Sequence, residues 1–397
     1  TALDEALKES ERKLNLSVLP TKGTNDKINN PFSNVRVAIT GIGAVGHWGI
    51  SQDGVLDAVK SSIETGNGET LGHAHFSLKD YEKSKYERRM NALTQYTIGA
   101  AMTALQHAEL DESETTEIGF IYGTARGSTE SISRYLQSVF VKGPEFASSI
   151  YFPHTVINSV AGKTAQKLKL QAFNSSISTG GNEGITAALY AAGMIRNGDL
   201  PACLIGAGDE RSALSDAIDR AKGLTESRYV STEGSVCMVL KNMDQAMAEG
   251  SDMLAELRGF GTAFTADLKT EAKEAVIRNA INGALSESDL SWDLIDLVLL
   301  NSVGRTNELE WEQVLLTKMA GSFNTVLPVV CLNDHFGYGE SYSSMLHLAS
   351  AAELVSSRQS WGMFREQNGF NDKQLDHVLV ISSSVNGNYT VAVVSRI

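Results

Sequence analysis

Three cysteines and a few histidines are the side chains best suited to nucleophilic or metal chemistry in this sequence of 397 residues. Cys331 precedes His335 by four residues, so the two could act as a nucleophile and its base. However, Cys331 lies in the apolar run Leu327–Leu332, and Cys203 and Cys237 lie in similar strand-like runs. Because free cysteine is among the most buried residue types, we interpret all three as structural thiols.

Neither a metal nor a nucleotide cofactor is expected. His73 and His75 would share one face of a strand, but no carboxylate or cysteine set completes a metal site. The segment Gly41–Gly46 spells G-x-G-x-x-G after an expected strand at Val35–Thr40. A dinucleotide site needs a helix opening at these glycines and an acidic residue about 20 positions on. That context is absent and Ser61–Glu69 is polar, so we predict a tight structural turn.

The composition is that of a globular protein, with 42% hydrophobic residues and 20% charged residues. A formal net charge of −13 disfavours nucleic acid and anionic membrane as partners. The sequence holds no apolar run of about 18 residues and no signal-peptide pattern at its start. Three widely spaced cysteines make no disulfide framework. We therefore expect a cytoplasmic protein with no membrane span.

Strands alternate with helices along the chain, which predicts largely parallel sheets covered by helices. The order of elements repeats, so we expect a five-layered α-β-α-β-α fold from two similar halves. The predicted parts are an N-terminal extension over 1–33, a first half over 34–245 and a second over 246–397. Expected strands lie at Val35–Thr40, Ile118–Tyr122, Ala202–Gly208, Ser235–Leu240, Leu297–Asn301, Leu327–Leu332, Val378–Ser382 and Thr390–Val394. Expected helices lie at Ala2–Leu14, Ser128–Phe140, Ile185–Met194, Ser344–Leu354 and from about Glu308.

Several segments resemble the β-ketoacyl synthases. The opening VRVAITGIGAVGHWG is similar to the first strand and turn of that family. The stretch from Gly143 to Asp199, with FPHTVINSVAGKTA and NSSISTGGNEGITAALYAAGMIRNGD, is similar to the segment around its nucleophile. STEGSVCMVL and SSSVNGNYTVAVV match later strands. The resemblance covers roughly residues 35–397 and implies a thiolase-like fold.

At the matched positions the catalytic groups are absent. A working ketosynthase carries a cysteine on a sharp strand-to-helix turn, where backbone amides lower its pKa and hold the thioester oxyanion. In the gapless match that cysteine falls on Gly181, and the first catalytic histidine falls on Val303. His335 is a candidate for the second histidine, although no lysine lies nearby and a structural or interface role is favoured. We therefore expect no catalytic residues.

The resemblance then implies a chain-length factor, the inactive subunit of a type II polyketide ketosynthase heterodimer. Such a subunit pairs with an active ketosynthase, which receives the acyl carrier protein, and closes the acyl tunnel. Many carry glutamine in place of the cysteine, so Gly181 suggests a divergent branch. The expected interface strand comprises Asn174, Ser175, Ser176, Ile177, Ser178 and Thr179. The expected tunnel residues are Ile132, Tyr135, Leu136 and Val139, with ordinary core packing as the alternative.

Two other functions stay open. The chain could be an independent acyl-thioester enzyme that uses Glu183 and His335, or a homodimeric binding protein of the same fold. Arg126 follows a strand in a polar turn, and we expect it to be solvated rather than to meet a partner.

Overall fold

The computed structural model of the chain describes residues 35–51, 54–58, 72–80, 90–111, 113–221, 229–267, 269–303, 308–321, 327–356 and 374–397. The expected helix at Ala2–Leu14 and the extension over 1–33 lie outside these residues. Residues Asn34–Ile397 form one compact unit. Among the described residues of this unit, eleven strands are hydrogen-bonded in two arrays that meet at β1 and β7.

The two arrays have the same topology. The first runs in the order β4 (Asn174–Ile177), β3 (Gly119–Gly123), β5 (Ala202–Asp209), β6 (Gly234–Asn242) and β1 (Val37–Gly46). The second runs in the order β9 (Val329–Val330), β8 (Leu297–Asn301), β10 (His377–Ser383), β11 (Asn388–Ser395) and β7 (Ala255–Phe264). In each array the first three strands are parallel to one another, and the fourth strand is antiparallel to both of its neighbours. The short β2 (Gly49–Ile50) forms a hairpin with β1. An internal duplication of one strand order explains this symmetry.

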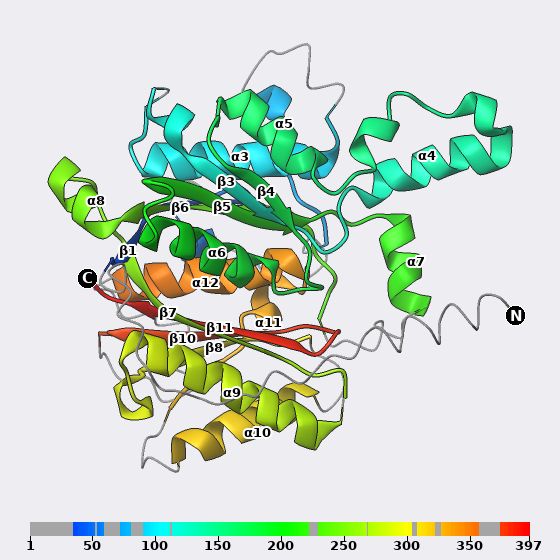
Figure 1. Cartoon of the computed structure of the whole chain (residues 1–397). Helices are drawn as coiled ribbons and strands as arrows, with labels where there is room; N and C mark the ends of the chain where they lie inside the picture. The colour runs from blue at the N-terminus through cyan, green and yellow to red at the C-terminus, as the bar shows by residue number, and fades with distance from the viewer. Residues whose placement is uncertain are drawn as a thin grey trace, which may run out of the picture. The chain divides into compact units, whose positions relative to one another are not determined.

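Helices cover both arrays and separate them (Figure 1). The helices α3 (Ala92–His107) and α5 (Ser159–Leu168) lie outside the first array, and α9 (Thr270–Ser288) and α10 (Glu308–Gly321) lie outside the second. Between the arrays lie α6 (Glu183–Arg196) and α12 (Ser341–Ser356). Fourteen of the sixteen residues of α12 are buried, as expected for a helix with sheets on both sides. The predicted five-layered α-β-α-β-α fold of two similar halves is confirmed.

The structure describes several further helices. They are α4 (Thr129–Lys142), α7 (Ala213–Ala221), α8 (Met243–Glu249), α11 (Asn333–Phe336) and the short 3-10 helices Leu78–Asp80, Glu114–Glu117, Pro144–Phe146, Phe152–His154 and Trp292–Leu294. The predicted boundary after residue 245 falls inside α8 and stays a prediction. None of the helices that the structure describes is both long and apolar enough to cross a membrane.

The glycine motif is not a turn, because Gly41 and Gly43 lie inside β1. A Cβ atom at either position would lie 2.2 Å from a backbone oxygen of α3, at Ala104 and Ala100 respectively. The glycines therefore allow α3 to pack directly on the strand. The same arrangement recurs in β7, where Gly259 and Gly261 face Ala284 and Ala280 of α9. This G-x-G repeat marks the first strand of each half, and sequence reasoning missed β7.

Other differences are smaller. The expected strand Leu327–Leu332 is reduced to the two residues of β9, and the helices extend a few residues further than predicted. His73 and His75 lie in irregular chain rather than on a strand. His73 Nδ1 lies 3.3 Å from a carboxylate oxygen of Glu233, and within the described residues no group of three His, Cys, Asp or Glu is arranged to hold a metal.

Candidate functional site

The turn between β4 and α6 carries Gly181, the position at which the resemblance placed the nucleophile. Gly180 and Gly181 have φ angles of +88° and +127°, a region that L side chains rarely adopt. A Cβ atom at Gly181 would have the Tyr338 hydroxyl at 3.4 Å and Ser384 Cβ at 3.7 Å. The neighbouring space is thus sufficient for a small side chain, but the backbone favours glycine. As it stands, the turn has no group that can be acylated at this position.

The carboxylate of Glu183 occupies the amide donors of this turn. Glu183 is the first residue of α6, and its side chain is fully buried. One carboxylate oxygen accepts hydrogen bonds from the backbone N–H groups of Thr179 and Gly180, both at 2.6 Å. The other oxygen accepts from the Gly181 N–H at 2.9 Å and from the Ser341 hydroxyl at 2.8 Å. Amides that could hold a thioester oxyanion are therefore already bound by the chain's own anion.

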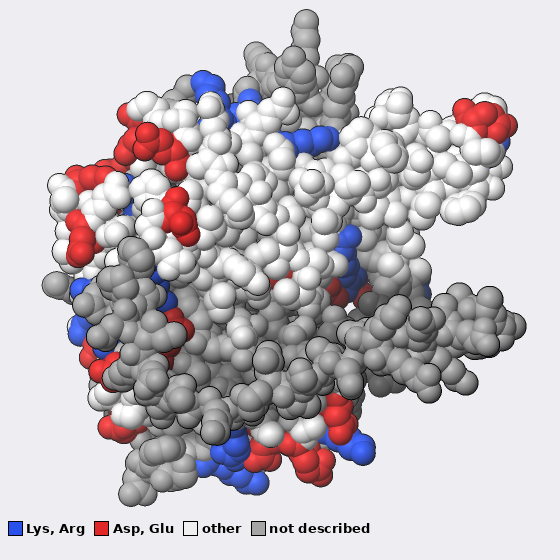
Figure 2. All heavy atoms as spheres, in the orientation of Figure 1, with Lys and Arg blue, Asp and Glu red and all other residues white. Residues whose placement is uncertain are grey.

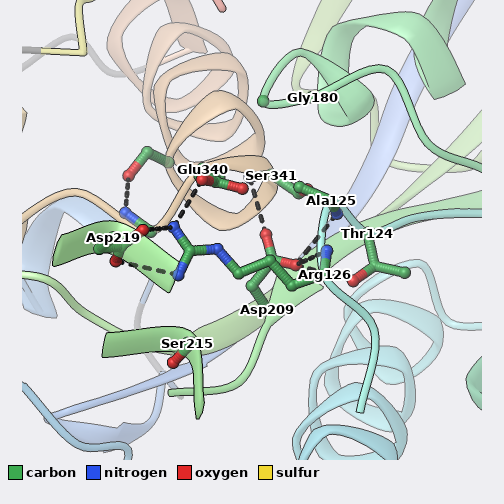
Figure 3. A network of polar contacts seen from close by, with 12 residues as sticks. Thr124, Ala125, Arg126, Gly180, Asp209, Ser215, Asp219, Glu340 and Ser341 are labelled. Atoms are coloured by element: carbon green, nitrogen blue, oxygen red, sulfur yellow. Dashed lines mark hydrogen bonds and ion pairs between the residues drawn. The ribbon is translucent and has the colours of Figure 1, made fainter. Parts of the chain in front are cut away.

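A second buried carboxylate lies at the start of α12, the central helix of the other half (Figure 3). One oxygen of Asp209 accepts from the Ser341 N–H at 2.9 Å. Its other oxygen accepts from the Thr124 hydroxyl at 2.7 Å and from the N–H groups of Ala125 and Arg126 at 3.0 Å. Burial, reinforced by Glu340 and Glu183, raises the pKa of Asp209.

Arg126 supplies positive charge to this acidic cluster. Its guanidinium donates to Asp219 of α7 at 2.8 and 3.0 Å and to Glu340 at 2.5 Å, as Figure 3 shows. Only 17% of the side chain is exposed, so the expectation of a solvated turn is wrong. Burial opposes the charge, but Glu340 and Asp219 outweigh it and raise the pKa of the guanidinium.

These contacts reverse the electrostatics that a thiolate enzyme needs. The positive ends of helices and free backbone N–H groups stabilise a thiolate or an oxyanion. Here Ser341, the first residue of α12, is contacted by the carboxylates of both Glu183 and Asp209. Glu183 also accepts from the three backbone amides of the turn that precedes α6. A further anion at this place would find these donors already occupied. The donors of the turn and of Ser341 are thus engaged by carboxylates of the chain itself.

Neutral side chains connect the two halves beside the turn. The Asn182 amide accepts from the Ser382 hydroxyl at 3.0 Å, and the Ser382 hydroxyl accepts from Asn301 at 2.9 Å. Asn301 in turn accepts from Asn333 at 2.9 Å. Val303, the predicted position of the first histidine, is 3% exposed and follows β8. Side-chain amides and hydroxyls of this kind do not ionise near neutral pH, so they are poor general acids or bases.

The side chain that lies beside Gly181 is that of Tyr338, in the turn before α12, and not that of His335. Burial raises the pKa of the Tyr338 hydroxyl well above its ordinary value, so the group is neutral. His335 lies in α11 and is half-buried, and burial lowers its pKa. Cys331 forms no pair with it: the thiol lies 3.1 Å from the Tyr229 hydroxyl, and burial raises the pKa of this thiol to about 11.

The predicted tunnel residues lie on α4, which projects from the layered body (Figure 1). Together with the segment that follows it, α4 forms an arm of residues 129–157, here called the apolar arm. Ile132, Tyr135 and Val139 are half-buried and Leu136 is 38% exposed, so none of the four is a core residue. The Tyr135 ring packs on Phe152 at 5.6 Å. The exposed apolar side chains of the arm are Leu136, Phe140, Val141, Phe146, Ile150, Phe152, Val156 and Ile157.

The predicted interface strand is β4, which covers four of its six residues. Its neighbour on one side is β3, and it is the terminal strand of the sheet that the structure describes. Its residues are half-buried or exposed, unlike those of the fully buried β3 and β5. A strand of this kind offers unpaired backbone groups to another chain.

Comparison with known proteins agrees with this architecture. Residues 58–246 match the model of the β-ketoacyl synthase N-terminal domain. The ishigamide ketosynthase/chain length factor superposes with a TM-score of 0.76 at 18% identity, over 91% of this chain and 99% of that one. A type II polyketide acyl-carrier protein in complex with its ketosynthase, AntDE:AntF, gives 0.76 at 19% identity over the same shares. This chain has the ketosynthase fold.

Curated relatives are 3-oxoacyl-[acyl-carrier-protein] synthases 2. The one from Vibrio cholerae is 29% identical over 50% of this chain and 53% of the relative. The one from Vibrio harveyi is 28% identical over 61% of this chain and 66% of the relative. The chain thus spans about half to two thirds of the length of these relatives.

Sequence reasoning found Gly181 but missed the acidic cluster around it. Glu183 was considered only as a catalytic suspect, and Asp209 and Glu340 were not considered. One available signal was the acidic residue in the first turn of α6, where carboxylates are favoured by the helix dipole. The contacts of Asp209 and Glu340 join β3, β5 and α12, so no local pattern could reveal them.

Proposed function

We propose that this chain is a non-catalytic, ketosynthase-like chain-length factor. It would pair with an active ketosynthase, shape the acyl tunnel at their interface and limit chain length in type II polyketide biosynthesis, with a polyene or aromatic product. The observation that carries this proposal is the turn at Gly181, which has no side chain and whose amides are bound by Glu183.

The same contacts argue against an independent enzyme. A general base at Glu183 would need a free oxygen directed at the substrate. Each of its carboxylate oxygens instead accepts two hydrogen bonds at 2.6–2.9 Å, and the side chain is fully buried. His335, the other candidate, lies in a separate short helix, whereas the residue beside the turn is the neutral Tyr338.

Pairing with another chain is supported by the apolar arm. From residue 146 to residue 162 the sequence contains no Asp, Glu, Lys or Arg. Phe140 and Val141 are 80% and 79% exposed, and on the face that Figure 2 shows the arm carries charge only near its far end. Contiguous exposed apolar surface marks an interaction site, and obligate interfaces bury roughly 2,000 Å² or more. The terminal strand β4 would add backbone pairing to the same interface, with Ser178 and Thr179 after it.

The half-buried residues of α4 would contribute to the tunnel. None of these four residues belongs to the hydrophobic cores that pack against the sheets: Ile132, Tyr135, Leu136 and Val139. In a dimer they would therefore lie near the partner rather than inside this chain. The Tyr135–Phe152 ring pair fixes a bulky group there. Larger side chains at these positions would shorten an enclosed acyl chain, because packed interiors resist added volume.

The active ketosynthase is the proposed partner, and the acyl carrier protein would dock through it. This assignment is supported by the two solved structures that combine a ketosynthase with a chain length factor or a carrier protein. The net charge of −13 would repel an acidic carrier protein from this chain itself. Three free, buried cysteines fit a reducing compartment, and we propose a cytoplasmic location.

The test is co-expression of the chain with the ketosynthase encoded beside it, followed by purification through a tag on one subunit and native mass spectrometry. A one-to-one complex, or a pair of such complexes, is expected. Phe140→Arg and Ile150→Arg should weaken it, because each places a charge in the apolar arm. Val314→Arg is the matched control, since Val314 is 51% exposed on α10, in the outer layer of the other half.

Other results would contradict the proposal. A clean homodimer that leaves the ketosynthase behind would favour the homodimeric binding protein. Turnover of acyl thioesters by the chain alone would favour the independent enzyme. Equal loss of the complex in the Val314→Arg control would show that the arm is not the specific contact.

A further inference from the structure

The turn from Thr179 to Gly181 has the geometry of an anion-binding site. Three consecutive backbone N–H groups, from Thr179, Gly180 and Gly181, converge on one carboxylate at 2.6, 2.6 and 2.9 Å. Ser341, from the other half of the chain, adds a fourth donor at 2.8 Å and is fully buried. Backbone N–H groups that converge in this way form concave sites that bind anions in many proteins.

The bound carboxylate of Glu183 is not a helix cap. A capping side chain satisfies the free amides inside the first turn of its helix. The Glu183 side chain instead reaches back to amides that precede α6, while the Gly184 N–H inside the helix is satisfied by the Ser344 hydroxyl at 2.9 Å. The Gly184 amide of α6 thus has an acceptor of its own, and the contact of Glu183 with the turn requires a separate explanation.

The surrounding sequence also makes room for this contact. Gly123, the last residue of β3, lies directly against Glu183. A Cβ atom at Gly123 would lie 2.3 Å from Glu183 Cβ, a separation at which something must shift. The absence of a side chain at Gly123 is thus part of what places the carboxylate under the turn.

We propose that the turn from Thr179 to Gly181 is a carboxylate-binding site that the chain keeps filled with its own Glu183. The same donors would fit a carbonyl oxygen that gains negative charge, so Glu183 excludes an acyl group from them. Two separate features then keep this site inactive: the absent side chain at Gly181 and the occupied amides. With Glu183 shortened, the site should accept a small planar carboxylate such as formate. The inference deepens the proposed function, but its test needs no partner subunit.

The first experiment compares Glu183→Ala with the wild-type full chain by thermal unfolding. The variant should unfold at a lower temperature, and sodium formate should raise its midpoint in a saturable way. Sodium chloride at the same ionic strength should not. Glu274→Ala, which removes an exposed carboxylate of α9, is the control. In either salt its unfolding midpoint should change in the same way as that of the wild-type chain. Equal midpoints of Glu183→Ala in formate and chloride would overturn the proposal.

A second variant covers the case in which Glu183→Ala does not fold. Glu183→Gln keeps the shape of the side chain, but an amide can accept hydrogen bonds with only one of its two ends. One set of donors then loses its acceptor, and hydrogen exchange of the amides at Thr179–Gly181 should become roughly ten- to hundredfold faster. Exchange in the core strand β5 should be unchanged. Unaltered exchange at Thr179–Gly181 would refute the assigned role of the carboxylate.

Discussion

The Glu210 carboxylate connects the apolar arm to the body, and its replacement should change how stability depends on pH. Glu210 directly follows β5 and is 3% exposed. One oxygen accepts from the Glu130 N–H in the first turn of α4 at 2.8 Å, and the other accepts from the Leu93 N–H in the first turn of α3 at 3.4 Å. Burial raises the pKa of this carboxyl from 4.5 to about 7, with the two amides acting in the opposite direction.

The sign follows from the raised pKa in the folded state. The carboxyl is protonated in both states below pH 4.5, so its stabilising contribution is then complete, and it is lost as the pH rises through 7. One pKa unit corresponds to about 1.4 kcal/mol, so the full change amounts to about 3 kcal/mol. Between pH 5 and pH 8 the expected part is about 2.5 kcal/mol.

Glu210→Gln removes this dependence because an amide stays neutral. The wild-type free energy of unfolding, taken relative to the variant, should therefore fall by about 2–3 kcal/mol from pH 5 to pH 8. Urea unfolding at one protein concentration, followed by tryptophan fluorescence, measures it. The hydrogen bonds lost to the variant act equally at both pH values and cancel. Glu274→Gln, on the exposed face of α9, is the control. The same difference at both pH values would refute the reasoning.

Three further outcomes test the site and the buried thiols. Gly181→Cys should lower the unfolding free energy by about 1–3 kcal/mol because of the φ of +127° at this position, and it should restore no condensing activity with acyl and malonyl thioesters. Gly193→Ala is the control, because this position on α6 faces open space and the change should not destabilise the chain. Condensing activity in Gly181→Cys would contradict the role of Glu183. Arg126→Met should lower the free energy of unfolding, measured with denaturant, by roughly 3–5 kcal/mol, because it leaves buried carboxylates unpaired. Arg134→Met breaks an exposed pair and should cost under about 1 kcal/mol. Equal losses of stability in the two variants would oppose this account. Iodoacetamide at pH 8 should label none of Cys203, Cys237 and Cys331 before denaturant is added, because burial raises the pKa of each thiol. Mass spectrometry of the folded chain would reveal any labelled thiol.

Much of the fold could be predicted from local patterns. Apolar runs such as Ile118–Tyr122 and Val378–Ser382 overlap the observed strands β3 and β10, because buried parallel strands are continuously hydrophobic. β7 was missed because glycines, charged residues and polar residues interrupt its apolar pattern in AELRGFGTAF. Its partner strands β1 and β11 supply the hydrogen bonds that a propensity argument cannot see.

The sequence by itself determined which residue types stand at the matched positions and which fold to expect. Gly181 and Val303 lack the groups for nucleophilic and proton-transfer chemistry wherever the chain places them, because side-chain identity alone decides that. Only the tertiary structure decided what replaces those groups. The contacts of Glu183 with Ser341 and of Arg126 with Glu340 span 158 and 214 residues, and their strength depends on burial that no local sequence encodes.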